Sequence, residues 1–143
     1  MKERKSWREK LADSKDLPKT LLIPAPREVD ELMHQVPRGK VTTINEIRAA
    51  LARRHGATLA CPLTTGIFAW IAAHAAAEAA AAGDKDVTPY WRTLKAGGQL
   101  NAKYPGGLTG QTKLLEAEGH EVVKKGRVQV VADHERVLFA FPA

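Results

Sequence analysis

The longest apolar stretch of the chain, residues 67–82, is the feature that most restricts how the chain can fold. It is rich in alanine, the strongest helix former, and Gly83, a common helix terminator, follows it. His74 and Glu78 interrupt the stretch, so we do not expect it to span a membrane. The sequence instead predicts a long helix packed within a domain. It begins at Thr64 or Thr65, either of which can cap it.

Two further helices are predicted before this one. The first covers residues 27–36, which carry acidic side chains early and an apolar stripe on one face. The second follows a capping box formed by Thr43 and Glu46, and ends at Gly56. Three successive helices, two of them joined by short turns, predict a helix-turn-helix.

The C-terminal third predicts a glycine-rich loop, a helix and a hairpin. The loop covers residues 84–107, and a fourth helix covers residues 109–118. Residues 120–123 and 127–131 are expected to pair as strands through a turn at Gly126. The predicted fold is therefore α+β and mainly helical, a winged-helix-like helix-turn-helix domain with a small C-terminal β-hairpin. Its expected limits are residues 27–143, preceded by an N-terminal arm of residues 1–26.

Length and residue types exclude several classes of protein. A chain of 143 residues suits one domain, and its single cysteine, Cys61, excludes an intramolecular disulfide. The five histidines are scattered without the spacing of metal ligands, so neither a metal nor another cofactor is expected. The N-terminus mixes basic and acidic residues and lacks an apolar signal core, which favours a cytoplasmic location.

The distribution of charge favours a polyanionic partner. The net charge is +6, and residues 91–115 carry four basic side chains and no acidic one, whereas residues 61–90 are net negative. Residues 1–20 carry seven basic and four acidic side chains. These stretches indicate either a phosphate-binding surface or a solvated basic face.

Three motifs, in order along the chain, resemble a known family. They are Val36-Pro-Arg-Gly-Lys-Val-Thr42 running into Glu46, Pro89-Tyr-Trp-Arg92, and Tyr104-Pro-Gly-Gly-Leu108 running through Lys113 to Gly119. Together they resemble the C-terminal DNA-binding domain of the guanine-O6 alkyltransferases, also called methylated-DNA-protein cysteine methyltransferases, and of the alkyltransferase-like proteins. The resemblance covers about residues 29–119 and does not extend to the family's N-terminal domain.

The second motif differs from that of the family at the two residues that carry out alkyl transfer in the family. The family has an acceptor cysteine and an activating histidine where this chain has Tyr90 and Trp91. A phenol and an indole cannot replace an activated thiolate, so we expect a protein that is not an enzyme. Alkyltransferase-like proteins also lack the cysteine, and they bind damaged DNA without repairing it. The resemblance therefore implies DNA as the partner, and the sensing of altered or alkylated guanine as the function.

Other departures concern the extrusion of a base from the duplex. The family's tyrosine that helps to rotate the nucleotide falls on Ile44, and its arginine that fills the vacated stack falls near Thr65. Residues 67–82 contain no basic side chain. Base flipping would therefore need another wedge, such as Phe68 or Trp70.

The candidate DNA-binding or base-pocket residues combine aromatic rings, hydroxyl groups, cations and one carboxylate. They are Thr42, Thr43, Tyr90, Trp91, Arg92, Lys95, Lys103, Tyr104 and Glu118. Aromatic rings stack on bases, while hydroxyls and helix N-terminal amides bind phosphate. The resemblance places Arg92 and Glu118 at matching positions of the family's active-site network. The structural alternatives are that the aromatic residues belong to the core, that Thr43 only caps a helix, and that Glu118 satisfies buried amides.

Two alternative functions stay open. The same fold can serve as a protein-interaction or small-ligand module, which the alanine-rich third helix, without lysine or arginine, favours. The chain can also be a transferase that uses Cys61, near the start of that helix, although a small buried side chain is the simpler role for this residue. His74, on the apolar face of the same helix, is expected to be a hydrogen-bonded core residue.

Overall fold

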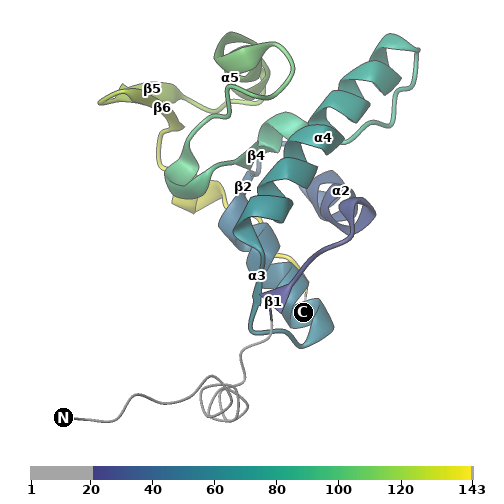
Figure 1. The fold of residues 1–143 in the computed structure, drawn as a ribbon. Helices are drawn as coiled ribbons and strands as arrows, with labels where there is room; N and C mark the ends of the chain where they lie inside the picture. Colours follow the sequence, from purple (N-terminus) through teal and green to yellow (C-terminus); the bar gives the residue numbers. More distant parts are fainter. Residues whose placement is uncertain (1–20, 143) are drawn as a thin grey trace, which may run out of the picture.

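The computed structural model describes residues 21–142, so most of the expected N-terminal arm lies outside the described residues (Figure 1). Four helices dominate, and short 3-10 helices and strands connect them, which confirms the mainly helical α+β prediction. The helices are α2 (Pro26–Gln35), α3 (Ile44–His55), α4 (Pro62–Ala81) and α5 (Gly107–Ala117), with the 3-10 helices η1 (Tyr90–Arg92), η2 (Ala96–Gly98) and η3 (His134–Val137). The strands are β1 (Leu21–Leu22), β2 (Thr42–Thr43), β3 (Leu59–Ala60), β4 (Thr93–Leu94), β5 (Val122–Lys125) and β6 (Val128–Val131).

Helix α3 begins and ends as its sequence predicts. The Thr43 hydroxyl accepts a hydrogen bond from the Glu46 amide at 3.3 Å, which satisfies one of the free N–H groups of the first turn. At the other end Gly56 adopts a left-handed conformation with φ of 63°, where a side chain would be strained.

Helix α4 begins earlier than expected, at Pro62. Proline suits the first helical position because its φ is already helical and its missing N–H needs no partner there. The predicted start at Thr64 or Thr65 is therefore wrong. Thr65 is buried inside the helix, and its hydroxyl donates to the Cys61 carbonyl at 2.6 Å. The end at Gly83, with φ of 95°, agrees with the prediction.

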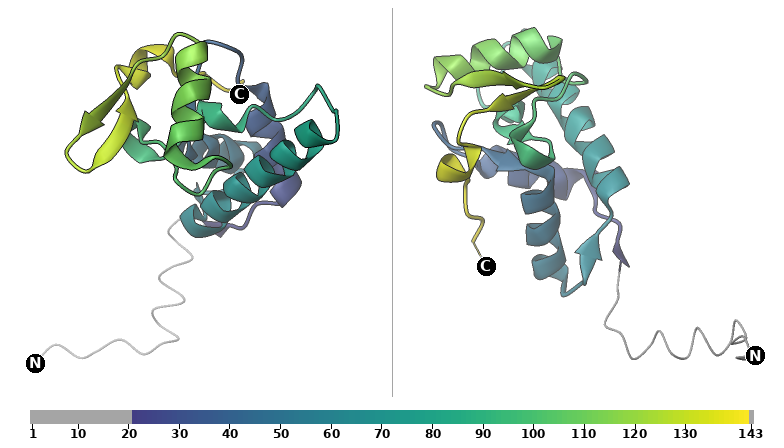
Figure 2. Two further views of the ribbon diagram at one scale, coloured as in Figure 1. Left: turned by 90° about the horizontal axis from the view of Figure 1, so that it is seen from above. Right: turned by 90° about the vertical axis from the view of Figure 1, so that its left-hand side faces the viewer.

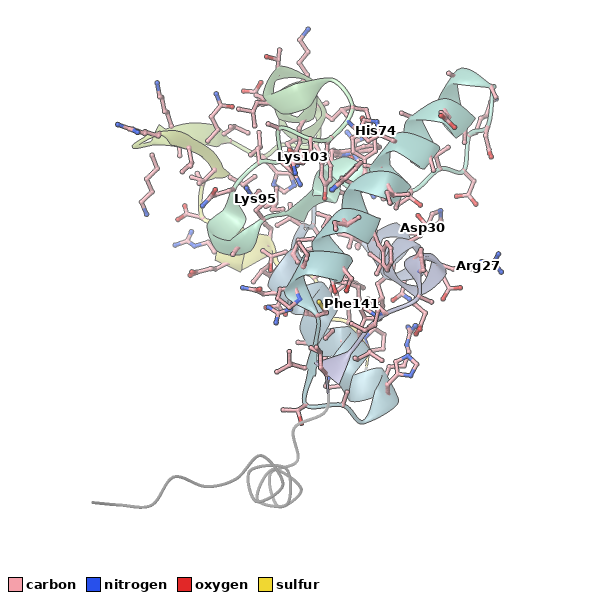
Figure 3. All side chains as sticks on the ribbon, in the orientation of Figure 1. Arg27, Asp30, His74, Lys95, Lys103 and Phe141 are labelled. Carbon is pink, nitrogen blue, oxygen red and sulfur yellow. The ribbon has the colours of Figure 1, made fainter. Side chains whose placement is uncertain are left out.

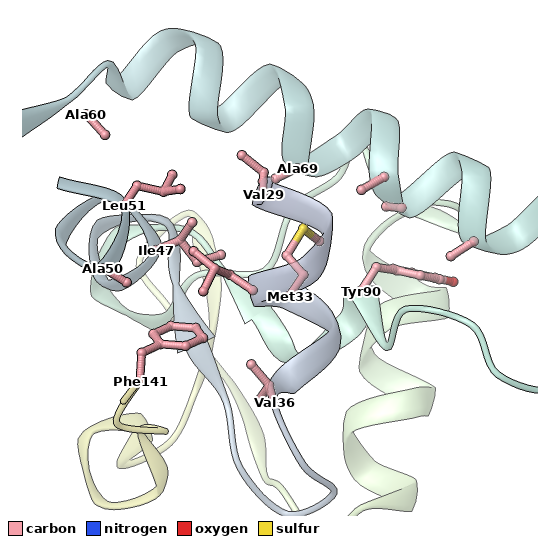
Figure 4. Close-up of a cluster of buried hydrophobic side chains, with 14 of the residues drawn as sticks. Val29, Met33, Val36, Ile47, Ala50, Leu51, Ala60, Ala69, Tyr90 and Phe141 are labelled. Carbon is pink, nitrogen blue, oxygen red and sulfur yellow. The ribbon is translucent and has the colours of Figure 1, made fainter. Parts of the chain in front are cut away.

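Helices α2, α3 and α4 enclose the larger core. Val29 and Met33 of α2 pack against Ile47 of α3 and Ala69 of α4 (Figure 4). The buried face of α4 consists mainly of alanines, whose small side chains let α2 approach closely. The alanine-rich stretch is thus a packed helix, as predicted from its sequence.

Short strand pairs join the helices and build a smaller second core. Strand β1 pairs in parallel with β3, and β2 pairs in parallel with β4. Strands β5 and β6 form the predicted antiparallel hairpin at the end of the chain (Figure 2). Its turn lies at Gly126 and Arg127, so Lys124 and Lys125 belong to β5 rather than to the turn. The second core is formed by Val41, Leu94, Leu100, Leu115 and Val131.

No helix within residues 21–142 is both long and apolar enough to cross a bilayer.

Candidate nucleic-acid interface

The segment in the place of the family's cysteine motif forms η1, and its first residue is buried. Tyr90 is 8% exposed, and its ring makes edge-to-face contacts with Trp91 and Tyr104, at centroid distances of 5.3 and 5.6 Å. Burial raises the pKa of the Tyr90 phenol, and it raises that of Tyr104 further. Both phenols are therefore neutral at ordinary pH, and neither is activated as a nucleophile.

Arg92 and Glu118 form a buried ion pair behind η1. Arg92 Nη2 lies 2.7 Å from Glu118 Oε2 and Nε lies 2.9 Å from Oε1, so the contact is bidentate. The Trp91 indole N–H donates to the same carboxylate at 2.9 Å, and Arg92 Nη1 donates to the Val36 carbonyl at 2.7 Å. The cluster therefore joins the end of α2, η1 and the end of α5.

Charge and hydrogen bonding keep the carboxylate of this cluster ionised. Burial by itself would raise the pKa of Glu118, but hydrogen bonds from Arg92 and Trp91 outweigh that effect and lower the pKa. Its donors among residues 21–142 are the Arg92 guanidinium and the Trp91 indole. The arrangement holds three segments together rather than presenting a free base.

The two threonines of β2 face the interior. Thr42 is fully buried, and its hydroxyl makes no hydrogen bond to any described residue. Thr43 is 5% exposed and caps α3. Their pairing with the buried residues Thr93 and Leu94 accounts for this position, because it packs β2 against β4 and η2.

An apolar groove lies between the beginnings of α3 and α4 and the loop after η2. We call it the α3–α4 groove. It has a volume of about 440 Å³ and is lined by Ile44, Leu63, Ile67, Trp70, Lys95 and Lys103, among others. Figure 3 shows Lys95 and Lys103 on one side of α4, and Arg27 and Asp30 on its other side.

Cations and an aromatic ring meet at this groove. Lys95 and Lys103 are exposed, and neither forms an ion pair with a residue in the described range 21–142. Lys103 Nζ lies 5.9 Å from the centroid of the half-buried Trp70 ring, within the range of a cation–π contact. The groove therefore combines an aromatic face with two charges that are free to bind phosphate.

His74 lies beside this groove, and its expected burial in the core is wrong. The side chain is exposed, because the buried face of α4 runs through Ala69, Ala72, Ala73 and Ala76 instead. The expected hydrogen bond is present, since Nε2 lies 2.8 Å from the Lys103 carbonyl oxygen. His74 thus ties the groove loop to α4.

Cys61 is half-buried and precedes α4. Hydrogen bonds from Thr64 lower the pKa of its thiol. The nearest histidine in the sequence is His55. Its Nε2 lies 2.7 Å from Oε2 of Glu28, so this nitrogen already has a partner. The surroundings of Cys61 thus favour its thiolate form. The histidine nearest to it in the sequence, His55, is bound to Glu28 instead.

The structure divides the nine candidate residues into two groups. Lys95 and Lys103 line the α3–α4 groove, whereas the other seven are buried or half-buried and do not line it. Sequence reasoning missed Ile67 and Asn101 as lining residues. The sequence suggests Trp70 only as a possible wedge for base flipping. In the structure Trp70 lines the groove, beside the exposed loop that carries Lys103.

Comparison with solved structures places this arrangement among known folds. A crystal structure of Atl1 of S. pombe in complex with damaged DNA containing O6-carboxymethylguanine matches with a TM-score of 0.51. It is 20% identical, and the match covers 80% of this chain and 93% of that chain. A second structure, S. pombe ATL in complex with DNA, gives the same values.

The chain has the fold of an alkyltransferase-like protein. The resemblance inferred from the three motifs is confirmed at the level of the fold. No protein-family model matches the sequence, and neither does any curated protein.

Proposed function

We propose that this chain binds DNA without catalysis and senses altered or alkylated guanine. The observation that carries the proposal is the α3–α4 groove, which combines the Trp70 ring with the unpaired cations Lys95 and Lys103. Its fold is shared with Atl1, whose structure contains damaged DNA. Aromatic faces stack on bases and lysines bind phosphates, so the groove has both kinds of contact that an extruded base requires.

Each candidate residue has a role in this proposal. Helices α3 and α4 act as the helix-turn-helix of a winged-helix domain of residues 27–143, with β5 and β6 as its hairpin and residues 1–26 as an arm. Lys95 and Lys103 contact the DNA backbone, while Tyr90, Trp91 and Tyr104 form the wall behind the base. Thr42 and Thr43 support the start of α3, and the Arg92–Glu118 pair fixes η1. The protein acts in the cytoplasm.

The absence of catalysis follows from the chemistry of Tyr90. Its buried phenol has a raised pKa, and its neighbour Trp91 offers no basic nitrogen. The alternative is transfer to Cys61. A duplex with a labelled O6-methyl group on guanine tests it, because label that moves to the protein and is lost in Cys61→Ser would establish a transferase.

The salt dependence of DNA binding tests the groove itself. Replacing Lys95 and Lys103 by alanine should flatten the slope of log K against log salt by up to about two units, at about 0.9 for each phosphate contact. The matched control is Arg27→Ala with Lys85→Ala, which removes the same charge from two exposed residues that do not line the groove. Equal slopes in the two double variants would contradict the proposed role of the groove.

A second candidate function is a protein-interaction or small-ligand module. The observation that favours it is the apolar character of α4, which exposes Leu63 (70%) and Ile71 (45%) and has no lysine or arginine. A salt slope near zero for the unaltered chain would favour this function over DNA binding.

A further inference from the structure

The end of the β5–β6 hairpin is a compact cationic surface to which the proposed function assigns no contact with DNA. Lys124, Lys125 and Arg127 surround Gly126, so three of these four residues are basic, and all three side chains are exposed. We call them the hairpin cations. Within residues 21–142, no carboxylate forms an ion pair with any of them. Their charges are therefore available to a partner.

The hairpin and the α3–α4 groove belong to one hydrogen-bonded scaffold. Gln99 bridges Val130 of β6, and the Leu100 amide donates to the Gln129 carbonyl at 2.9 Å. On its other side the Gln99 carbonyl accepts from the Lys95 amide at 2.8 Å. Figure 1 shows the hairpin on the same side of the molecule as η2. Lys95, which lines the groove, is thus two strand spacings away from β6.

Packing fixes the base of the hairpin and leaves its end exposed. Val130 and Val131 are 9% and 2% exposed, because they pack toward the second core. The exposed residues at the other end, Lys125 and Val128, form the last pair before the turn. The hairpin cations are therefore held at a defined distance from the groove rather than on an independent loop.

This distance follows from strand geometry. Two strand spacings amount to about 10 Å, and the two to three residues from Val130 to the turn add about 7 to 10 Å along the strand. The backbone of Arg127 thus lies about 14 Å from that of Lys95, while Lys124 and Lys125, one strand spacing further away on β5, lie about 15 to 16 Å from it. Phosphates of one DNA strand recur about every 3.4 Å along the helix axis, so a duplex presents several phosphates within this separation.

We propose that the hairpin cations form a second phosphate-binding surface, which contacts the backbone of the duplex whose altered base occupies the groove. This inference rests on the proposed function. Lysine and arginine at the tip of a turn neutralise phosphates without reading base edges. The surface therefore supplies affinity that does not depend on sequence or on the lesion, while the groove supplies discrimination.

The test uses two triple variants of the full chain. Lys124→Gln, Lys125→Gln and Arg127→Gln together should flatten the slope of log K against log salt by up to about 2.7 units. The ratio of affinities for alkylated and plain duplex should stay unchanged. The matched control, Arg27→Gln with Arg53→Gln and Lys85→Gln, removes the same charge from exposed positions that neither line the groove nor belong to the hairpin, and it should keep the original slope.

The outcomes separate this inference from the proposed function. Duplex binding by the unaltered chain, with equal slopes in both triple variants, would overturn the role of the hairpin alone. A hairpin variant that loses binding to vesicles of anionic lipid but keeps its DNA slope would also overturn it. If the unaltered chain bound no duplex at all, the proposed function would fail, and the hairpin inference would fail with it.

Discussion

Replacing Arg92 by methionine should destabilise the domain strongly, because it leaves the Glu118 carboxylate in place without its charged partner. The Glu118 side chain is only 5% exposed and that of Arg92 14% exposed, so water replaces little of the lost contact. Removal of one member of a buried pair costs about 3 to 5 kcal/mol. The Val36 carbonyl also loses the hydrogen bond that Arg92 gives it. We expect a loss near the upper end of that range.

Urea unfolding followed by circular dichroism measures this loss. Arg38→Met is the matched control, because Arg38 is exposed and donates only to the Ala117 carbonyl at 3.0 Å, so its loss should be about 0.5 kcal/mol or less. The double variant Arg92→Met with Glu118→Gln should be less destabilised than the sum of the two single variants, because it leaves no buried charge. A loss below about 1 kcal/mol for Arg92→Met would refute the structural role of the pair.

Three further predictions concern residues around the site. The lowered pKa of Glu118 implies a contribution to stability that is complete above the unfolded-state pKa of about 4.3 and is lost as pH falls through the folded-state pKa. Unfolding measured against pH should therefore show a shallower acid loss in Glu118→Gln than in Glu116→Gln, and parallel curves would contradict this. Tyr90→Ala should lose about 3 to 5 kcal/mol of stability and, in the folded fraction, about 1 to 3 kcal/mol of discrimination for alkylated duplex; equal loss of affinity for both duplexes would make the ring purely structural. Gly98→Ala should lose about 1 to 3 kcal/mol, because its φ is 82° and a Cβ would lie 2.6 Å from His134 Nδ1, whereas Gly97→Ala, with φ of 76° and open space, should lose less.

The sequence predicts the helices well wherever local signals mark their ends. Thr43, Gly56 and Gly83 act within one turn of the helix, and the structure confirms all three. The start of α4 was misplaced because Pro62 and Thr65 compete as signals. The helix begins at Pro62, because the pairing of β3 with β1 keeps the chain extended up to Cys61 and proline suits the first helical position.

The site was less predictable, because it depends on contacts between distant segments. Charge alone indicates Lys95 and Lys103 in the sequence. That they line one groove with Trp70 depends on packing between segments about 30 residues apart. The pairing of β2 with β4 buries Thr42, although its own sequence neighbours give no sign of burial. The exposure of His74 follows from which face of an almost uniformly apolar helix meets α2, and residue periodicity cannot decide that.

The direct test of the central claim is a competitive titration of the unaltered chain with two duplexes of identical sequence. One carries a single O6-methylguanine, and the other carries guanine at the same position. Binding to the groove predicts tighter binding of the alkylated duplex by about 1 to 3 kcal/mol, which corresponds to roughly 5- to 150-fold in affinity. Equal affinities at two salt concentrations would contradict the sensing of altered guanine.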